Sequence, residues 1–293
     1  MTLTVPIVHA FIDGNQGGNP AGVVLDADRF TTEQKQTIAR QIGLSETAFV
    51  SRSVCADVKL EFFTPARQIA HCGHATVATF SYLQQQGRLS AKQSSKETID
   101  GCRAIALEGD YAYMAQTAPS FQALNEHQHH QLLESLGLTD ADRPTELIPS
   151  VVNTGNAFVI LAVNNMDTLA RLAVDQAGIA QLSEALDLIG VYVYTTETAD
   201  PQRHASARMF APRYGILEEA ATGMAAGPLA CYLYEVAGMT QQHFLIEQGR
   251  LMAEPSPSVI DVRLSLASDG HIDHLMAGGR AQVREQRSVE LVS

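Results

Sequence analysis

One carboxylate in this 293-residue sequence lies among mostly apolar residues, where an acid is unusual. Glu46 stands near the start of Leu44–Val50, a segment whose pattern predicts a strand. A glutamate in such a place is either a strand-edge acid that faces water or a general acid or base in a cleft, with its pKa tuned by burial. The residue pattern alone leaves both interpretations open.

A histidine stands where a helix is expected to begin. Cys72-Gly73-His74 opens an apolar segment with helical spacing, and Gly87 provides its stop. The first turn of a helix carries free backbone N–H groups and the positive end of the dipole, so it suits an anion. The same field lowers the pKa of an imidazole and favours its neutral form. His74 is therefore either a capping residue or a group that handles protons.

Several other kinds of chemistry are disfavoured. The sequence has no GxSxG, no HExxH, no Walker motif and no pair of CxxC motifs. His71, Cys72 and His74 resemble a metal cluster, but neighbouring side chains diverge at a helix start and no second His/Cys pair completes a site. We therefore expect no metal site.

The composition excludes several classes of partner. The net charge of −12 argues against a nucleic-acid surface, and the longest apolar runs are far too short to span a membrane. The N-terminus has no basic leader and no cleavage site, so it is expected to form a first strand. The four cysteines are widely spaced without a CxxC pair, which indicates a reduced, cytoplasmic protein.

The elements that must position these residues occur twice. Residues 62–87 and 208–238 share one plan, in which a Phe-x-Pro strand end precedes an apolar helix led by glycine. One duplication with insertions would explain this repeat. Short strands and few helices, without a regular βαβ alternation, predict an α+β architecture in which two similar halves each carry one central helix.

Five sets of motifs, in order along nearly the whole chain, resemble the PhzF-like isomerases. This family is named for the phenazine-biosynthesis isomerase and is related in fold to diaminopimelate epimerase. The motifs are Gly18–Val23, Leu44–Val50, Phe62–Pro65 with Cys72–Thr76, Arg208–Pro212, and Ala221–Gly223 with Gln248-Gly249.

The resemblance implies a diaminopimelate epimerase-like fold. Each of two similar domains is then a curved, mostly antiparallel β-sheet or barrel around one central helix, with the active cleft between the domains. We expect the first domain at 1–122 and the second at 123–277, with the last strand, about 278–293, returning to the first domain.

The resemblance also implies a site. Glu46 would move a proton between carbons of a small carboxylate-bearing substrate, with no cofactor and no metal. The residues implied to assist Glu46 or to bind substrate are His74 and Glu219 (catalytic), and Asn19, Gly73, Thr222, Gly223 and Met224 (substrate-binding). Backbone N–H groups at the two helix starts would hold the carboxylate. Members of the family are often homodimers, and we expect one here.

The sequence departs from the family pattern at informative positions. Met224 replaces a serine, and Glu254 places an acid where an arginine is usual, which would weaken binding of an anion. Glu219 replaces an aspartate. A two-thiol racemase is disfavoured, because Thr222 stands where the second cysteine would be needed.

Two alternatives to an isomerase remain open. The first is a binding protein that keeps the cleft without turnover, which the departures at Met224 and Glu254 motivate. The second is a racemase or epimerase that uses Glu46 and Glu219 on an amino-acid-like substrate.

Overall fold

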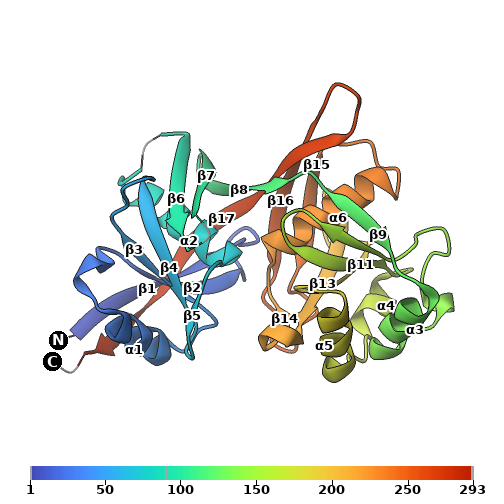
Figure 1. The fold of residues 1–293 in the computed structure, drawn as a ribbon, viewed down its shortest axis with the longest axis horizontal. Coiled ribbons are helices and arrows are strands. Elements are labelled where there is room, and N and C mark those ends of the chain that lie inside the picture. Colours follow the sequence, from blue (N-terminus) through green and yellow to red (C-terminus); the bar gives the residue numbers. More distant parts are fainter. Residues whose placement is uncertain (1, 90, 100, 292–293) are drawn as a thin grey trace. The chain divides into compact units, whose positions relative to one another are not determined.

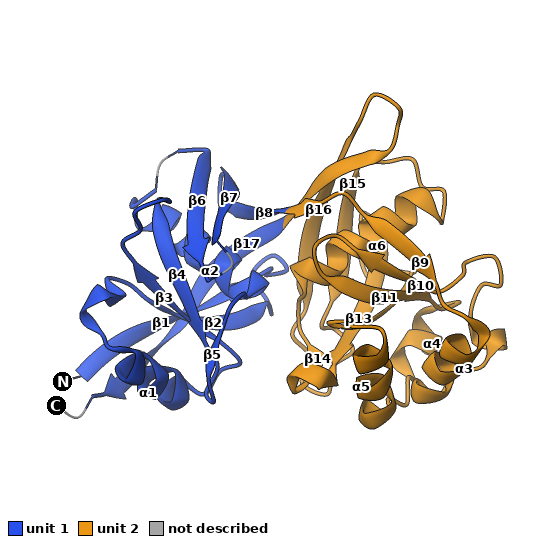
Figure 2. Cartoon of the chain, in the orientation of Figure 1, with its two compact units in different colours: residues 1–115, 278–293 blue, residues 116–277 orange. Residues whose placement is uncertain are grey.

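The computed structural model describes residues 2–89, 91–99 and 101–291, and the chain forms two compact units (Figures 1 and 2). Unit 1 contains residues 1–115 and 278–293, and unit 2 contains residues 116–277. The sequence placed the first boundary after residue 122. It falls earlier because β9 (Ser120–Ala123) pairs with β10 (Ser150–Asn153) in unit 2.

Unit 1 is a closed barrel. Its strands are β1 (Thr2–Ala10), β2 (Asn19–Val24), β3 (Thr47–Ser51), β4 (Val58–Phe63), β5 (Gln68–Ile69), β6 (Gln93–Thr98), β7 (Gly101–Glu108), most of β8 (Tyr111–Thr117) and most of β17 (Ile272–Glu290). Pairing runs β17–β1–β2–β3–β4–β6–β7–β8, and β8 pairs with β17, which closes the sheet. Residues 292 and 293 of the expected last strand lie outside the described residues.

Unit 2 contains a sheet and several covering helices. Besides β9 and β10, its strands are β11 (Ala157–Ala162), β12 (Gly190–Thr195), β13 (Ala205–Ala211), β14 (Ile216–Glu219), β15 (His243–Gln248) and β16 (Ser258–Leu266). The helices α3 (Glu126–Ser135), α4 (Met166–Ala170) and α5 (Gln176–Ala185) contribute leucine and isoleucine side chains to a core shared with β11, β12 and β13.

The two units repeat one series of strand pairings. From β1 to β7, the pairs are antiparallel, parallel, antiparallel, antiparallel, parallel and antiparallel. The pairs from β10 to β16 follow the same series. The predicted α+β class and internal repeat are therefore confirmed at the level of topology.

Each unit holds one buried helix at the same point of this series. The helix of unit 1 is α2 (Gly73–Gln85), and that of unit 2 is α6 (Gly223–Glu235). Every residue of α2 from Gly73 to Ser81 is buried, because the helix is apolar on nearly all sides and packs against β1, β2 and β3. Burial of Phe80 alone contributes roughly 1.5–3 kcal/mol.

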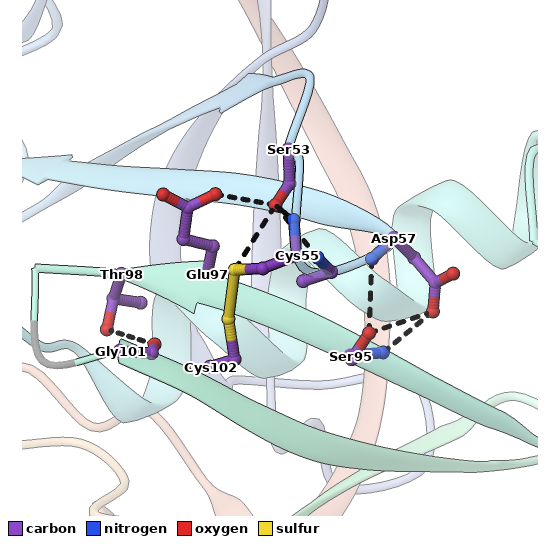
Figure 3. Close-up of a disulfide and its surroundings, with 9 residues drawn as sticks. Ser53, Cys55, Asp57, Ser95, Glu97, Thr98, Gly101 and Cys102 are labelled. Atoms are coloured by element: carbon purple, nitrogen blue, oxygen red, sulfur yellow. Dashed lines mark hydrogen bonds between the residues drawn. A yellow bond between two sulfur atoms is a disulfide. The ribbon is translucent and has the colours of Figure 1, made fainter.

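Two cysteines form a disulfide that the sequence analysis did not predict. Cys55 follows β3, Cys102 lies in β7, and Figure 3 shows their sulfurs joined. The parallel pairing of β4 with β6 brings the β3–β4 connection beside the β6–β7 hairpin, where Ser53 donates to Glu97. The expectation of four reduced cysteines was therefore wrong, because it considered only spacing along the chain.

Within the described ranges, no helix is both long enough and apolar enough to cross a membrane.

Candidate active site

Glu46 and His74 meet inside unit 1. Glu46 immediately precedes β3, and its carbonyl accepts from the Gly22 N–H of the neighbouring strand β2, which fixes the backbone. His74 is the second residue of α2, and its Nε2 lies 3.4 Å from Glu46 Oε2. The two residues are 8% and 4% exposed. Glu46 is therefore not a strand-edge acid that faces water, and its carboxylate lies within ion-pair distance of the His74 ring.

Cys72 completes a compact group with this pair. Its Sγ lies 3.5 Å from His74 Nδ1, whereas Glu46 contacts the other ring nitrogen, Nε2. Burial raises the pKa of the Cys72 thiol, so the sulfur is protonated at neutral pH. One oxygen, one sulfur and one ring nitrogen of the three residues lie within 4.8 Å of one another.

The start of α2 also provides backbone donors. The N–H groups of Gly73 and His74 belong to the first turn, so they have no acceptor within their own helix. Both residues are buried, and the positive end of the helix dipole favours an anion there. Asn19, in the same unit, is the first residue of β2. It pairs with Ala10 of β1 and is also buried.

The corresponding residues of unit 2 gather at the start of α6. Glu219 ends β14, and the Thr222 hydroxyl donates to Glu219 Oε2. Thr222 and Gly223 are buried, whereas Met224 is half-buried. The carboxylate of Glu219 is thus held beside the first turn of α6, as Glu46 is held beside the first turn of α2. Glu254, the other departure from the family pattern, is exposed.

A buried glutamine holds this segment in place. Gln248 ends β15 and is 1% exposed. Its Oε1 accepts from the Thr222 N–H at 3.1 Å and from the Tyr192 hydroxyl at 2.8 Å. Its Nε2 donates to the Glu219 carbonyl at 2.7 Å and to Thr222 Oγ1 at 3.1 Å. The Thr222 N–H therefore has an acceptor, whereas the N–H groups of Gly223 and Met224 belong to the first turn of α6 and have none within that helix.

A second glutamine fixes the next residue of α6. Gln116 Nε2 donates to the Gly223 carbonyl at 2.9 Å, and its Oε1 accepts from the Thr154 hydroxyl at 2.6 Å. Gly227 makes room for this side chain, since a Cβ at Gly227 would lie 2.2 Å from Gln116 Oε1. Sequence reasoning missed Gln116, Thr154 and Tyr192. It quoted Gln248 only as part of a motif, without a role.

The structure therefore brings the predicted residues together in two groups. Glu46, Gly73 and His74 form one in unit 1. Glu219, Thr222, Gly223 and Met224 form the other in unit 2. Each group pairs an acid with the first turn of a buried helix, which is the arrangement that general acid–base chemistry on a small anion needs.

Two similar units, each built around one buried helix, are typical of epimerase-like α+β proteins, and solved structures agree. A PhzF-family phenazine biosynthesis protein from Bacillus anthracis matches with a TM-score of 0.90 and 29% identity, covering 99% of this chain and 100% of that one. A hydroxyproline epimerase from Agrobacterium vitis matches with a TM-score of 0.56 and 12% identity, covering 98% and 92%. The second likeness shows the shared fold alone.

The family itself is shown by sequence. The model of the phenazine biosynthesis-like (PhzC-PhzF) proteins matches residues 8–286, so the chain belongs to this family of isomerases, as its motifs predicted. An uncharacterized isomerase of Bacillus subtilis is 31% identical over 276 residues, covering 92% of this chain and 93% of that protein. The trans-2,3-dihydro-3-hydroxyanthranilate isomerase of Pseudomonas chlororaphis is 32% identical over 233 residues, covering 78% of each.

Proposed function

We propose that this protein is a cofactor-independent isomerase that moves a proton between two carbons of a small carboxylate-bearing substrate, with Glu46 as the acid–base group. The observation that carries the proposal is the buried contact of Glu46 Oε2 with His74 Nε2, 3.4 Å apart, at the start of α2. A buried carboxylate beside an imidazole is a pairing that general acid–base catalysis uses, and its burial keeps bulk water away from the proton in transfer.

The steps follow from the positions of these groups. Glu46 in its ionised form takes a proton from one carbon of the substrate and returns it to another. His74 lies beside the Glu46 carboxylate and would offer a polar partner for the charge that develops on the substrate. The first-turn N–H groups of Gly73 and His74 would bind an anionic group of the substrate.

The group in unit 2 would bind and orient a carboxylate-bearing substrate in this proposal. Glu219, fixed by the Thr222 hydroxyl, would orient or polarise the substrate, and the N–H groups of Gly223 and Met224 would hold its carboxylate. Gln248 acts only through Glu219 and Thr222, so it is a positioning residue. Met224 offers a backbone donor regardless of its apolar side chain.

Two observations support a carboxylate-bearing substrate. They are the activity of one relative and the exposed position of Glu254. A relative from Pseudomonas chlororaphis is a trans-2,3-dihydro-3-hydroxyanthranilate isomerase, so a cyclic carboxylic acid is the first class to test. The acid at Glu254 is exposed, and water and salt screen a charge in such a position, so it leaves binding of an anion possible.

The test is solvent-deuterium incorporation. The wild-type protein is incubated in deuterated water with a panel of cyclic and amino-carboxylic acids that includes trans-2,3-dihydro-3-hydroxyanthranilate. We expect deuterium at one carbon and a shifted double bond. The substitution Glu46→Gln should lower the rate by roughly 10²–10⁴-fold with an unchanged fold. Glu285→Gln, the same change at an exposed position of unit 1, is the matched control.

Other outcomes separate the alternatives. If Glu46→Gln keeps the wild-type rate on an accepted substrate, Glu46 is not the acid–base group. A product that differs only in the configuration of one carbon would instead identify an epimerase. Binding of a panel member without any exchange would identify a binding protein.

A further inference from the structure

The donor atoms of Glu46, Cys72 and His74 have a chemistry that proton transfer alone does not require. Proton transfer uses the carboxylate and the imidazole, whereas the mechanism gives the Cys72 sulfur no task. A carboxylate oxygen, a cysteine sulfur and an imidazole nitrogen are the three ligand types that zinc takes in proteins. Three protein ligands with a fourth position open are also the usual number in a zinc site that is not purely structural.

We propose that Glu46, Cys72 and His74 form a binding site for one thiophilic divalent cation, with Zn²⁺ as the type, and that its occupation blocks acid–base chemistry at Glu46. Binding of the cation does not depend on the function proposed above, whereas inhibition of the acid–base chemistry at Glu46 rests on that function.

For an ion on either ring nitrogen of His74, one ligand-to-ligand distance already fits. Zinc–ligand bonds of about 2.0–2.3 Å at tetrahedral angles place the ligand atoms roughly 3.3–3.7 Å apart. Glu46 Oε2 and His74 Nε2 are 3.4 Å apart, and Cys72 Sγ and His74 Nδ1 are 3.5 Å apart. An ion on either ring nitrogen therefore already has one of its two other ligands at the right distance. The third donor atom lies within 4.8 Å of the others and has to move closer when the ion binds.

The surroundings favour a soft cation over a hard one. All three side chains are buried, at 8%, 5% and 4% exposure, so a bound ion would be screened little by water. A thiolate and a carboxylate together balance two positive charges. A bound zinc ion would displace the proton of the Cys72 thiol, as it does from coordinating thiols in general. The sulfur selects against Mg²⁺ and Ca²⁺, which prefer oxygen ligands.

The three ligands come from elements that the barrel holds together. Glu46 is held by the Gly22–Thr47 register of β2 and β3, while Cys72 and His74 frame the start of buried α2. The earlier expectation of no metal considered His71, Cys72 and His74 as neighbours on one helix start. It did not include Glu46, which approaches the same histidine from the residue before β3.

Occupation of this site would stop the proposed reaction. A carboxylate that is bound to a cation has lost the lone pair that must take the proton from carbon. The metal-free protein is then the active form, and Zn²⁺ inhibits by binding the same oxygen. We expect inhibition to follow occupancy one to one.

The experiment uses Co²⁺ as a spectroscopic substitute for Zn²⁺ on the full-length, chelator-treated protein. A thiolate–cobalt charge-transfer band should appear at one equivalent and disappear when Zn²⁺ is added. The band should be absent in Cys72→Ser and unchanged in Cys231→Ser, the matched control, because Cys231 is the other free cysteine and is buried in α6. Glu46→Gln should weaken Zn²⁺ binding by about tenfold or more.

Each result decides one part of the proposal. The absence of a thiolate–cobalt band in the wild type, or an equal band in Cys72→Ser, overturns the site. Zn²⁺ that binds at one equivalent without slowing deuterium exchange overturns the block and leaves the site standing. If no substrate is found at all, the cobalt titration still tests the site, so failure of the proposed function and failure of this inference are distinguishable.

Discussion

The amide of Gln248 allows a sharp test of how the start of α6 is built. Gln248→Leu would remove an acceptor from two buried donors, the Thr222 N–H and the Tyr192 hydroxyl, and a donor from the Glu219 carbonyl. Each buried polar group left without a partner costs roughly 1–3 kcal/mol, so we expect a loss of about 3–5 kcal/mol in the free energy of unfolding. That loss is a large part of the stability of an ordinary domain.

Two companion variants separate the contributions. Tyr192→Phe removes one donor only and leaves Gln248 bonded to Thr222, so it should cost about 1 kcal/mol. The double variant combines Gln248→Leu with Tyr192→Phe. It has no Tyr192 hydroxyl, so the cost of leaving that donor without an acceptor disappears. The double variant should therefore cost less than the sum of the single variants, by about 1 kcal/mol.

Gln248→Glu turns the same site into a pH-dependent one. Beside the Glu219 carbonyl, the introduced carboxyl group must keep a proton to donate, so its folded pKa rises above the unfolded value of about 4.3. A group with a raised pKa contributes stability that is fully present below its unfolded pKa and is lost as pH rises through its folded pKa. The free energy of unfolding of the variant should therefore be closest to that of the wild type near pH 4 and clearly lower than it at pH 8.

Urea unfolding of the four variants and the wild type at several pH values provides the measurement, with the slopes compared to check for two-state behaviour. The reasoning is refuted if Gln248→Leu costs less than about 1 kcal/mol, since buried donors left without partners cost more than that. A difference between Gln248→Glu and wild type that does not change with pH would equally contradict the assigned direction of the amide.

Three further predictions concern other parts of the chain. Burial, together with Lys96 and Arg103, lowers the pKa of His71 to about 3 from 6.5, so its contribution to stability is present above pH 6.5 and lost as pH falls toward 3. In urea unfolding, the free energy of unfolding of the wild type should fall between pH 6.5 and 4.5. His71→Gln should reduce the slope of that fall by at most about 1.4 kcal/mol per pH unit. Reduction of the Cys55–Cys102 bond should cost about 2–4 kcal/mol in wild type and nothing in Cys55→Ser, and titration of the denatured protein should count two thiols before reduction and four after it. Gly249→Ala should cost more than about 2 kcal/mol, because φ is +81° and a Cβ would lie 2.2 Å from the Ser256 carbonyl oxygen; Gly215→Ala, at φ +79° with nothing within 4 Å, should cost only about 1 kcal/mol.

Much of the fold could be predicted because its signals are local. The apolar runs that follow Cys72 and Thr222 are helical in spacing and apolar on nearly every side, which is why they predicted central helices. The repeat of a Phe-x-Pro strand end before each glycine-led helix predicted two similar halves, and the shared series of strand pairings confirms it.

The features that were missed join residues far apart in the sequence. Tyr192 and Gln248 are 56 residues apart, and Cys55 and Cys102 are 47 apart, so no spacing along the chain indicates either contact. The approach of Glu46 to His74 was expected only through the resemblance. Its geometry depends on β2 and β3 pairing in parallel, which a single sequence does not reveal.

The long strand β17 has a consequence for how the protein is made. Its residues from Gly278 onward complete the barrel that begins with Thr2–Ala10, whereas residues 116–277 form one uninterrupted stretch. On the ribosome, unit 2 can therefore fold before unit 1, although it is synthesised later. The barrel of unit 1 cannot close until β17 has been made. Until then β1 and β8 each carry one row of unpaired backbone groups, so a stalled or shortened nascent chain would expose two strand edges that can pair with other chains.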